Sequence, residues 1–390
     1  MHPALGQSAI DGGAITATID AKAKAVTVIS RDANLKTILE NAFRMHGGYR
    51  LAKPGTGTFT FTINPAGANA VMLKIQSGRP LVTQLEETVS GTSSVNAALR
   101  AADFAVLKTS GKPGFFAGKL AFVNETAGKQ EIYTSDLVFQ DVRRLTRDGS
   151  YSQHPRWSPD GGKLVYTGYY RTGFPDVFLI DLASGRRTTI AGYKGTNTGA
   201  VFSPNGRNLA MVLSSTGSPE VYVSGPEGQN AKMVTSGTQR SVESDPDWSP
   251  NGQQLVLTSD QLGGPQLFVV GVNVSRPQRP QRLPTNISGY CTEPAWNPDA
   301  KVNNIAFTAA TRGSHQVALY DLTTRSSRFL TTGSGSYTQA RWLNDGRHLI
   351  ATREVRGQST LCIIDSESGK ITPLPSGRLT SISQPDFVYP

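Results

Sequence analysis

Short runs of alternating apolar and polar residues recur through residues 118–390 and predict β-strands. Residues 163–167 (Lys-Leu-Val-Tyr-Thr) and 254–258 (Gln-Leu-Val-Leu-Thr) are two such runs, and each follows a Gly-bearing turn. A second turn, a second apolar run and a weaker strand-like segment then complete each unit. Because no helical period interrupts these units, the pattern predicts four short strands in each, counting the segment before the first turn.

A recurring phrase sets the length of these units. Its first copy, residues 155–161, reads Pro-Arg-Trp-Ser-Pro-Asp-Gly, and its aromatic residue recurs at positions 157, 202, 248, 296, 342 and 387. The fourth copy departs from the phrase at Asn297 and Ala300, and the fifth at Leu343 and Asn344. We expect a tight hairpin turn after each aromatic residue, with Gly taking the positive φ. Periods of about 40 to 50 residues with four strands each favour the blades of a β-propeller.

The two ends of the repeat array predict how the ring closes. Residues 118–146 contain three strand-like runs but lack the first strand of a unit, whereas residues 384–388 form a first strand without the rest. Pairing these segments completes one sheet and removes an open strand edge. The sequence therefore predicts a mainly β protein, in which residues 113–390 form a six-bladed β-propeller closed by the C-terminal strand.

Residues 21–112 lie outside the repeat and predict a small α/β domain. Strand-like segments occur at 25–29, 59–63, 70–75 and 81–85. A first helix is expected to begin at an N-cap Asn34 and to end at the Gly pair at 47 and 48. The residues expected to be buried on the first helix are Leu35, Ile38, Leu39, Ala42 and Phe43, and on a second helix over 93–107 they are Val95, Leu99, Ala102 and Val106. We expect residues 1–20 to be a flexible lead-in.

Composition narrows the class of protein. The chain has 39 Lys and Arg against 29 Asp and Glu, a formal net charge of +10, but the basic residues are scattered. We therefore expect a solvated basic surface and no nucleic-acid partner. No run approaches the length of apolar sequence that crosses a membrane. Cys291 and Cys362 are far apart in the sequence and are interpreted as two separate buried thiols.

The repeat resembles the TolB-type propeller family. The resemblance rests on Trp-Ser-Pro-Asp-Gly at 157–161 followed by Lys-Leu-Val-Tyr at 163–166, and on the α/β domain that precedes six blades. Residues 114–123 (Gly-Phe-Phe-Ala-Gly-Lys-Leu-Ala-Phe-Val) and 257–266 (Leu-Thr-Ser-Asp-Gln-Leu-Gly-Gly-Pro-Gln) also resemble members of this family. The similarity covers residues 25–390 and is more specific in the propeller than in the preceding domain.

The resemblance implies a non-catalytic, periplasmic component of the Tol–Pal cell-envelope system. It implies that the propeller mouth binds a Pal-like peptidoglycan-associated lipoprotein and that the N-terminal segment contacts a TolA-like inner-membrane protein. The implied role is in outer-membrane integrity and in envelope constriction during cell division. We expect a monomer that does not span the membrane. Since residues 1–9 lack the basic and apolar parts of a signal peptide, a periplasmic location presumes that the signal has been removed.

Polar residues just before each repeated aromatic are the candidate binding site. They should begin the innermost strand of each blade and line one mouth of the central channel. The set is Gln153, His154, Thr196, Asn197, Glu243, Ser244, Asp245, Thr292, Glu293, Thr338, Gln339, Ser383 and Gln384. Such a polar ring could hold a partner segment by hydrogen bonds, and the resemblance places Pal there. The alternative is a channel that is only solvated.

Other chemistries remain open at the same mouth. Glu243, Asp245 and Glu293 could coordinate Ca²⁺, but no acidic loop of fixed spacing accompanies them, and we predict no metal and no cofactor. No Gly-x-Ser-x-Gly motif occurs, and the five histidines lack metal-ligand spacing, so we predict that the protein is not an enzyme. Two alternatives are a propeller lyase or glycosidase that uses His154 and the mouth carboxylates, and a carbohydrate- or peptidoglycan-binding propeller.

Overall fold

The computed structural model describes residues 23–236, 241–377, 379 and 381–390. The chain divides into two compact units, residues 1–105 and 106–390. The division falls inside helix α3 (Ser94–Ser110), seven residues before the predicted domain boundary. The predicted lead-in, residues 1–20, lies outside the described residues.

The N-terminal unit is an α/β domain built on one sheet with strand order β2-β1-β3-β4-β5. Strand β1 pairs in parallel with β2 and β3, and the remaining pairs are antiparallel. The elements are β1 (Lys24–Ile29), α2 (Ala33–Met45), β2 (Tyr49–Leu51), β3 (Phe59–Pro65), β4 (Ala70–Ser77), β5 (Val82–Ser90) and α3. The predicted small α/β region is therefore confirmed.

Helix α2 begins two residues earlier than expected. Its N-cap is Asp32, not Asn34, because the Asp32 carboxylate accepts the backbone N–H groups of Asn34 and Leu35 at 2.9 and 3.0 Å. All five apolar residues predicted to face the core of α2 are buried. On α3, three of the four predicted residues are buried, whereas Val95 is half-buried.

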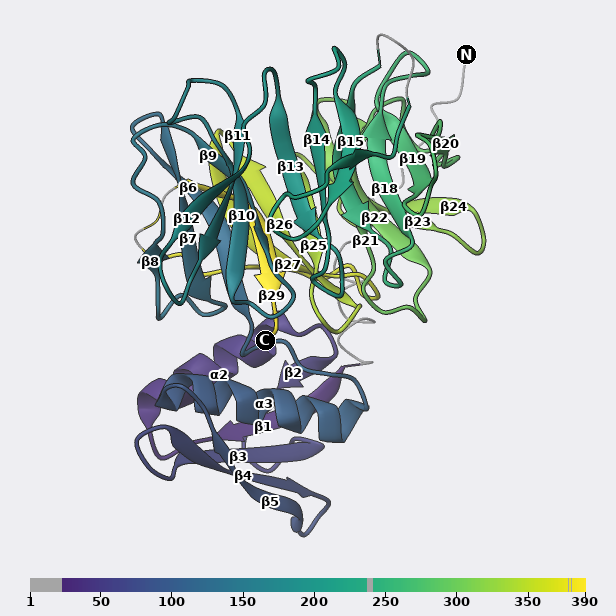
Figure 1. Ribbon diagram of the computed structural model, residues 1–390. Coiled ribbons are helices and arrows are strands. Elements are labelled where there is room, and N and C mark those ends of the chain that lie inside the picture. The colour runs from purple at the N-terminus through teal and green to yellow at the C-terminus, as the bar shows by residue number, and fades with distance from the viewer. Residues whose placement is uncertain (1–22, 237–240, 378, 380) are drawn as a thin grey trace, which may run out of the picture. The chain divides into compact units, whose positions relative to one another are not determined.

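The second unit is a propeller of six four-stranded antiparallel sheets within the described residues (Figure 1). Each blade is given from its innermost strand outward. Blade one contains β29 (Ile382–Val388), β6 (Lys119–Thr126), β7 (Lys129–Asp136) and β8 (Arg143–Arg144); blade two β9 (Ser152–Trp157), β10 (Lys163–Gly168), β11 (Asp176–Asp181) and β12 (Arg187–Ala191); blade three β13 (Asn197–Phe202), β14 (Leu209–Leu213), β15 (Glu220–Ser224) and β16 (Lys232–Met233); blade four β17 (Glu243–Trp248), β18 (Gln254–Ser259), β19 (Gln266–Gly271) and β20 (Gln281–Arg282); blade five β21 (Cys291–Trp296), β22 (Asn304–Thr311), β23 (Ser314–Asp321) and β24 (Ser326–Phe329); blade six β25 (Ser336–Trp342), β26 (His348–Val355), β27 (Gln358–Asp365) and β28 (Ile371–Pro373).

The C-terminal strand closes the ring, as the sequence predicts. Strand β29 pairs antiparallel with β6, from Ile382 opposite Asn124 to Val388 opposite Lys119. The yellow end of the chain in Figure 1 thus completes a sheet whose other strands come from the beginning of the propeller.

The repeated phrase folds into the same turn in successive blades. In blade two the Ser158 hydroxyl accepts the backbone N–H of Lys163 at 2.8 Å and donates to the Asp160 carboxylate. Equivalent bonds join Ser249 to Gln254 and to Asn251 in blade four. The Gly that ends each turn has a positive φ, 66° at position 161 and 68° at position 252. These bonds explain why Ser, Asp or Asn, and Gly recur together.

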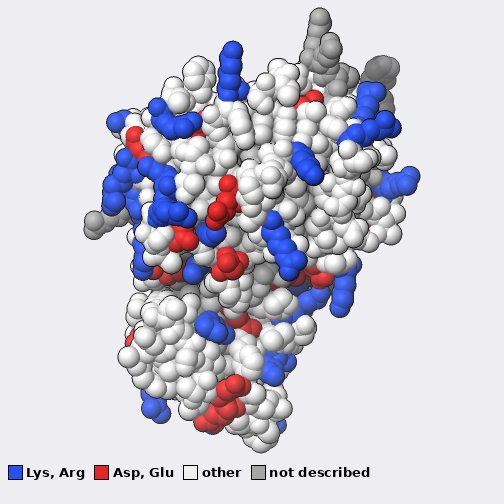
Figure 2. Space-filling model, viewed as in Figure 1, with Lys and Arg blue, Asp and Glu red and all other residues white. Residues whose placement is uncertain are grey.

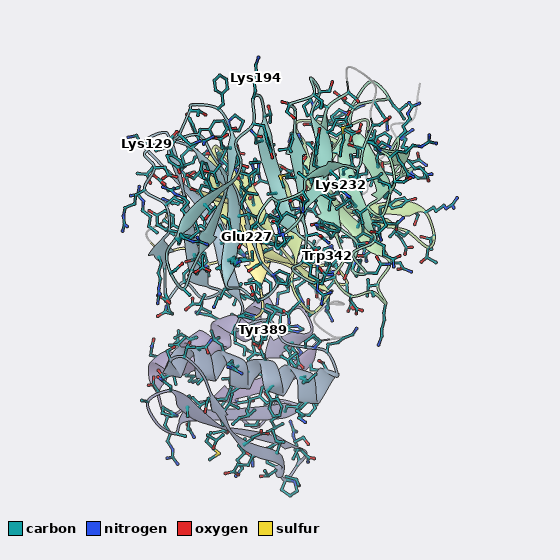
Figure 3. All side chains as sticks on the ribbon, in the orientation of Figure 1. Lys129, Lys194, Glu227, Lys232, Trp342 and Tyr389 are labelled. Atoms are coloured by element: carbon teal, nitrogen blue, oxygen red, sulfur yellow. The ribbon has the colours of Figure 1, made fainter. Side chains whose placement is uncertain are left out.

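The repeated aromatic residues form much of the packing between blades. Trp157, Trp248 and Trp342 are buried, and Figure 3 shows Trp342 among the strands. The indole N–H of Trp248 donates to a backbone carbonyl of blade three at 3.1 Å, and that of Trp342 to a carbonyl of blade five at 3.0 Å. Trp296 differs because its side chain stays half-buried.

The two cysteines are placed in the structure as the sequence predicts. Cys291 and Cys362 are both buried and free, which confirms two separate thiols. Burial raises the pKa of the Cys362 thiol to about 12.

No helix in the described part of the chain is long and apolar enough to cross a membrane. Lys and Arg are spread over the face of the propeller seen in Figure 2, with Asp and Glu among them.

Candidate functional site at the channel mouth

Each innermost strand bends at a β-bulge close to its beginning. The bulged residue lies three positions before the repeated aromatic, and the strand register shifts there in all six blades. These residues have positive φ: His154 52°, Gly199 63°, Asp245 52°, Glu293 54°, Gln339 56° and Gln384 52°. Non-glycine residues seldom adopt this conformation, and bulges re-aim side chains. The repeat therefore places one specially oriented residue per blade around the channel.

Hydrogen bonds link these bulged residues from blade to blade. The Gln339 N–H donates to Glu293 Oε2 at 2.8 Å, the Gln384 N–H donates to Gln339 Oε1 at 3.1 Å, and the His154 N–H donates to Gln384 Oε1 at 2.7 Å. Four consecutive blades are connected in this way. The next bulged residue in the ring, Gly199, has no side chain that could accept a further bond. The mouth is therefore fixed in position on one side.

Threonines of the second strands support the same side chains. Thr308 donates to Glu293 at 2.7 Å, and Thr352 donates to Gln339 at 2.8 Å. Thr258 occupies the corresponding place in blade four, and it is 4% exposed with no hydrogen-bond partner for its hydroxyl among the described residues.

A cavity of about 260 Å³ opens between the innermost strands of blades four and five. Asp245 and Glu293 line it, and so does the unpartnered Thr258. Burial raises the pKa of the Glu293 carboxyl, and the charge of Asp245 raises it further. Asp260 adds a third carboxyl group to the lining. The cavity thus offers acceptors and negative charge to a hydrogen-bond donor or a cation.

His154 belongs to the same ring. Part of its side chain is open to water in the channel, but protein atoms surround it, and this burial lowers its pKa. The charge of Asp245 opposes that shift, whereas the charges of Arg341 and Arg156 reinforce it. A neutral imidazole is therefore favoured at the mouth.

The channel wall also contains an ion-pair network that the sequence reasoning missed. Arg156 bonds to Asp247 at 2.9 Å and to Asp386 at 3.2 Å. The second oxygens of these aspartates accept backbone N–H groups, Asp386 from Trp157 and Asp247 from Trp296, both at 2.7 Å. The available signal was a charged residue directly before the aromatic in four copies of the repeat, at 156, 247, 341 and 386.

The structure brings ten of the thirteen predicted mouth residues to equivalent positions in five blades. They lie three or four residues before the aromatic and are half-buried or exposed: Gln153, His154, Ser244, Asp245, Thr292, Glu293, Thr338, Gln339, Ser383 and Gln384. The other three differ. Thr196 and Asn197 precede the equivalent residues of blade three, Thr198 and Gly199, by two positions, and Thr196 is half-buried.

Asn197 and Glu243 do not face the channel, and the prediction that they line its mouth is wrong. The Asn197 side chain is fully buried and donates to the carbonyls of Tyr193 and Pro175 at 2.8 and 3.2 Å. Glu243 is also fully buried, beside Glu220 of blade three. Burial and that neighbouring carboxyl raise the pKa of Glu243 to about 8. The physical reason is the β-bulge that follows them, which breaks the two-residue alternation of the strand, so these residues turn between blades.

The three carboxylates considered as Ca²⁺ ligands do not converge. Asp245 and Glu293 share the mouth cavity, whereas Glu243 is absent from its lining. Within the described residues, no set of metal-binding side chains with ligand atoms inside 4.8 Å of one another includes this trio.

A family model and two relatives that are similar to this chain all carry the name TolB. The TolB beta propeller domain model matches residues 106–282. The Tol-Pal system protein TolB of Desulfosudis oleivorans is 34% identical over 125 residues, which is 32% of this chain and 28% of the relative. The protein of the same description from Anaeromyxobacter dehalogenans is 28% identical over 177 residues, 45% of this chain and 40% of the relative. These matches span less than half of the relatives' own length.

Among solved structures, the crystal structure of TolB from Acinetobacter baumannii is similar over nearly the whole chain. Its TM-score is 0.79, it is 20% identical, and the match covers 94% of this chain and 97% of that one. At this identity the similarity bears on the fold, and it extends to both units of the chain.

Proposed function

We propose that the protein is the TolB component of a Tol–Pal system, on the premise that the TolB beta propeller domain model matches residues 106–282. In this proposal it is non-catalytic and periplasmic, and its channel mouth binds a Pal-like lipoprotein. Its role is to support outer-membrane integrity and envelope constriction. Contact with a TolA-like protein through the N-terminal segment stays a prediction, since residues 1–22 lie outside the described residues.

The mouth cavity between blades four and five carries this proposal. It combines two carboxylates, Asp245 and Glu293, with the Thr258 hydroxyl, a buried group with no hydrogen-bond partner in the described part of the chain. An unpartnered buried polar group costs about 1–3 kcal/mol, and a bound donor would recover that free energy. The bulge bonds hold Glu293 in place beforehand, which lowers the entropic cost of binding. A Lys, Arg or amide side chain of the partner suits this cavity.

Titration of the purified chain with the soluble domain of a Pal-like lipoprotein tests the proposal. Asp245→Asn should weaken binding about tenfold, because Asn tolerates the positive φ but lacks the charge. Thr258→Val should weaken it about threefold to fivefold, as expected for one lost hydrogen bond. The matched controls are Asp141→Asn and Thr189→Val, both exposed on the propeller surface, and they should leave affinity within about twofold.

Two results would contradict the proposal in different ways. Wild-type affinity in both mouth variants would mean that the partner binds elsewhere on the chain. No binding of the Pal-like domain to the wild-type protein would reject the proposed function itself.

A second candidate function is a lyase or glycosidase at the same mouth. It is favoured by two bulged residues of the same ring, His154, whose pKa is lowered, and Glu293, whose pKa is raised, because acid–base sites combine groups shifted in opposite directions. Depolymerisation of an acidic glycan that is lost in both His154→Gln and Glu293→Gln would favour this candidate over the binding role.

A further inference from the structure

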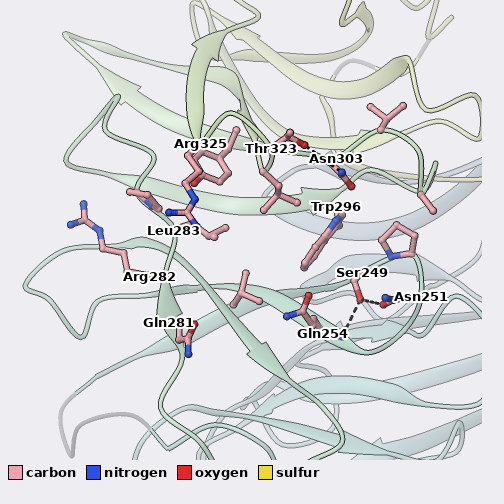
Figure 4. Close-up of a pocket in the computed structure, with 17 residues that line it drawn as sticks. Ser249, Asn251, Gln254, Gln281, Arg282, Leu283, Trp296, Asn303, Thr323 and Arg325 are labelled. Carbon is pink, nitrogen blue, oxygen red and sulfur yellow. Dashed lines mark hydrogen bonds between the residues drawn. The ribbon is translucent and has the colours of Figure 1, made fainter.

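A second, larger cavity lies between blades four and five at the opposite end of the strands. Strand β17 begins at the mouth with Glu243 and ends at Trp248, and the turn that follows, residues 249–251, lines this cavity. The volume is about 720 Å³, and other walls come from residues 281–284, 302–303 and 322–323 and from Arg325 (Figure 4). The cavity is thus separate from the mouth although it shares the same pair of blades.

Trp296 provides an open aromatic face in this cavity. The other tryptophans of the repeat are buried, but the side chain of Trp296 is half-buried and lines the cavity. Its indole N–H has no acceptor among the described residues, unlike the indoles of Trp248 and Trp342. A flat apolar surface with a free donor at its edge is suited to stacking against a ring that also carries polar groups.

The rest of the lining combines apolar side chains, such as Val269, Leu283 and Leu322, with polar and positively charged ones. Exposed amide and hydroxyl side chains are contributed by Asn251, Gln254, Gln281, Asn303 and Thr323. Arg282 and Arg325 add two guanidinium groups, and no carboxylate is among the lining residues. Neither arginine forms an ion pair within the described residues. In Figure 4 the arginines stand on one side of the cavity, and Trp296, Asn303 and Gln254 on the other.

We propose that this cavity binds an acidic saccharide. The apolar face of one sugar ring would stack on the indole of Trp296, and its hydroxyl groups would bond to the surrounding amides. The carboxylate of the same or the next ring would pair with Arg325 or Arg282, which have no ion-pair partner among the residues that the structure describes. This site goes beyond the proposed mouth function and does not depend on it.

Calorimetric titration of the full chain with a hyaluronan tetrasaccharide, which alternates glucuronate and N-acetylglucosamine, tests the site. The uncharged comparison ligand is the same tetrasaccharide with its carboxyl groups reduced. Arg325→Gln should weaken binding of the acidic ligand about fivefold or more and leave the uncharged ligand within about twofold. Arg312→Gln, an exposed arginine on another turn of blade five, is the matched control and should change neither.

Trp296→Phe tests the stacking separately, and it should weaken both ligands about threefold or more. Blades one and three have Phe at the equivalent position, Phe387 and Phe202, so the variant should keep its packing. Both variants should bind a Pal-like partner as the wild type does. Absence of saturable binding of the tetrasaccharide, or wild-type affinity in both variants, would overturn the proposal. Equally strong, Arg325-dependent binding of inorganic phosphate would also overturn it, since the site would then recognise only an anion.

Discussion

The seam of the propeller and the junction of blades four and five are opposite in character. At the seam the C-terminal strand meets the strand that begins the propeller, yet β29 is held on both sides: Gln384 and Asp386 bond to blade two, and the Gln384 N–H bonds to blade six. Blades four and five are joined by continuous chain, but their junction opens into a cavity at each end. One junction maintains the ring, and the other has room for ligands.

This difference suggests how a symmetric repeat acquires distinct sites. Bonds that close the ring cannot be lost without opening it, so polar groups at the seam are used for structure. The junction of blades four and five contributes less to closing the ring. Its two cavities differ in charge, with carboxylates at the mouth and arginines at the far end. The two junctions should therefore respond differently to mutation.

The largest effect should come from removing the seam strand. Deletion of residues 381–390 removes β29, exposes the edge of β6 and leaves Arg156 without Asp386. We expect aggregation or the loss of a cooperative thermal transition, measured by circular dichroism and light scattering. Removal of Pro390 alone, which lies beyond β29, is the control and should leave the transition unchanged. A truncated protein with the wild-type transition would disprove the closing role of this strand.

Breaking the ion pairs of Arg156 should have the next largest effect. This side chain is 10% exposed, and Arg156→Leu leaves Asp247 and Asp386 without their closest cation. Loss of one partner of a buried pair costs about 3–5 kcal/mol, so the free energy of unfolding in urea should fall by roughly that amount.

Arg143→Leu is the control for this change, because it breaks an exposed pair with Asp141 and should cost less than about 1 kcal/mol. If the two variants were equally stable, the network would not hold the seam.

A smaller effect, which depends on pH, is expected where blade three meets blade four. The pKa of Glu243 is about 8 in the folded protein against an ordinary value of 4.5, so the folded state binds the proton more tightly than the unfolded chain. The contribution of this group to stability is therefore fully present below about pH 4.5 and is lost as pH rises toward 8. Glu243→Gln should remove a destabilisation of roughly 2–4 kcal/mol at pH 8 and little at pH 4.5.

Urea unfolding at several pH values measures this difference. Parallel stability profiles for the wild type and Glu243→Gln would show that Glu243 does not titrate between these limits. The size of the difference would also show how strongly Glu243 affects the junction of blades three and four, for comparison with the junction of blades four and five.

The sequence predicts the periodic parts of the molecule well and the irregular parts poorly. The spacing of the aromatic residues determines six blades and the pairing of β29 with β6, because both follow from the count of strands. Asn197 and Glu243 were misplaced because a bulge breaks the two-residue alternation, so residues close to it in the sequence point in different directions. Counting residues back from the repeated aromatic residue does not reveal this change in side-chain direction.

The two cavities could not be predicted for a different reason. The mouth carboxylates stand out in the sequence, but the unpartnered state of Thr258 depends on which side chains of two blades meet. Trp296 has the same place in the repeat as three buried tryptophans, and only its neighbours make it different. Unlike the repeat, the side-chain contacts between particular blades carry no periodic signal in a single sequence.

The pairing of β29 with β6 also has a consequence for the order in which the protein forms. Ile382 and Asn124 are opposite one another in this pair although more than 250 residues separate them. During synthesis β6 must therefore wait with one edge unpaired until residues 382–388 have left the ribosome. Contacts between such distant segments slow folding, because the entropy of closing a long loop must be overcome first. Ring closure should then be the final and slowest step, and a protein that binds exposed strand edges could protect the chain until that step is complete.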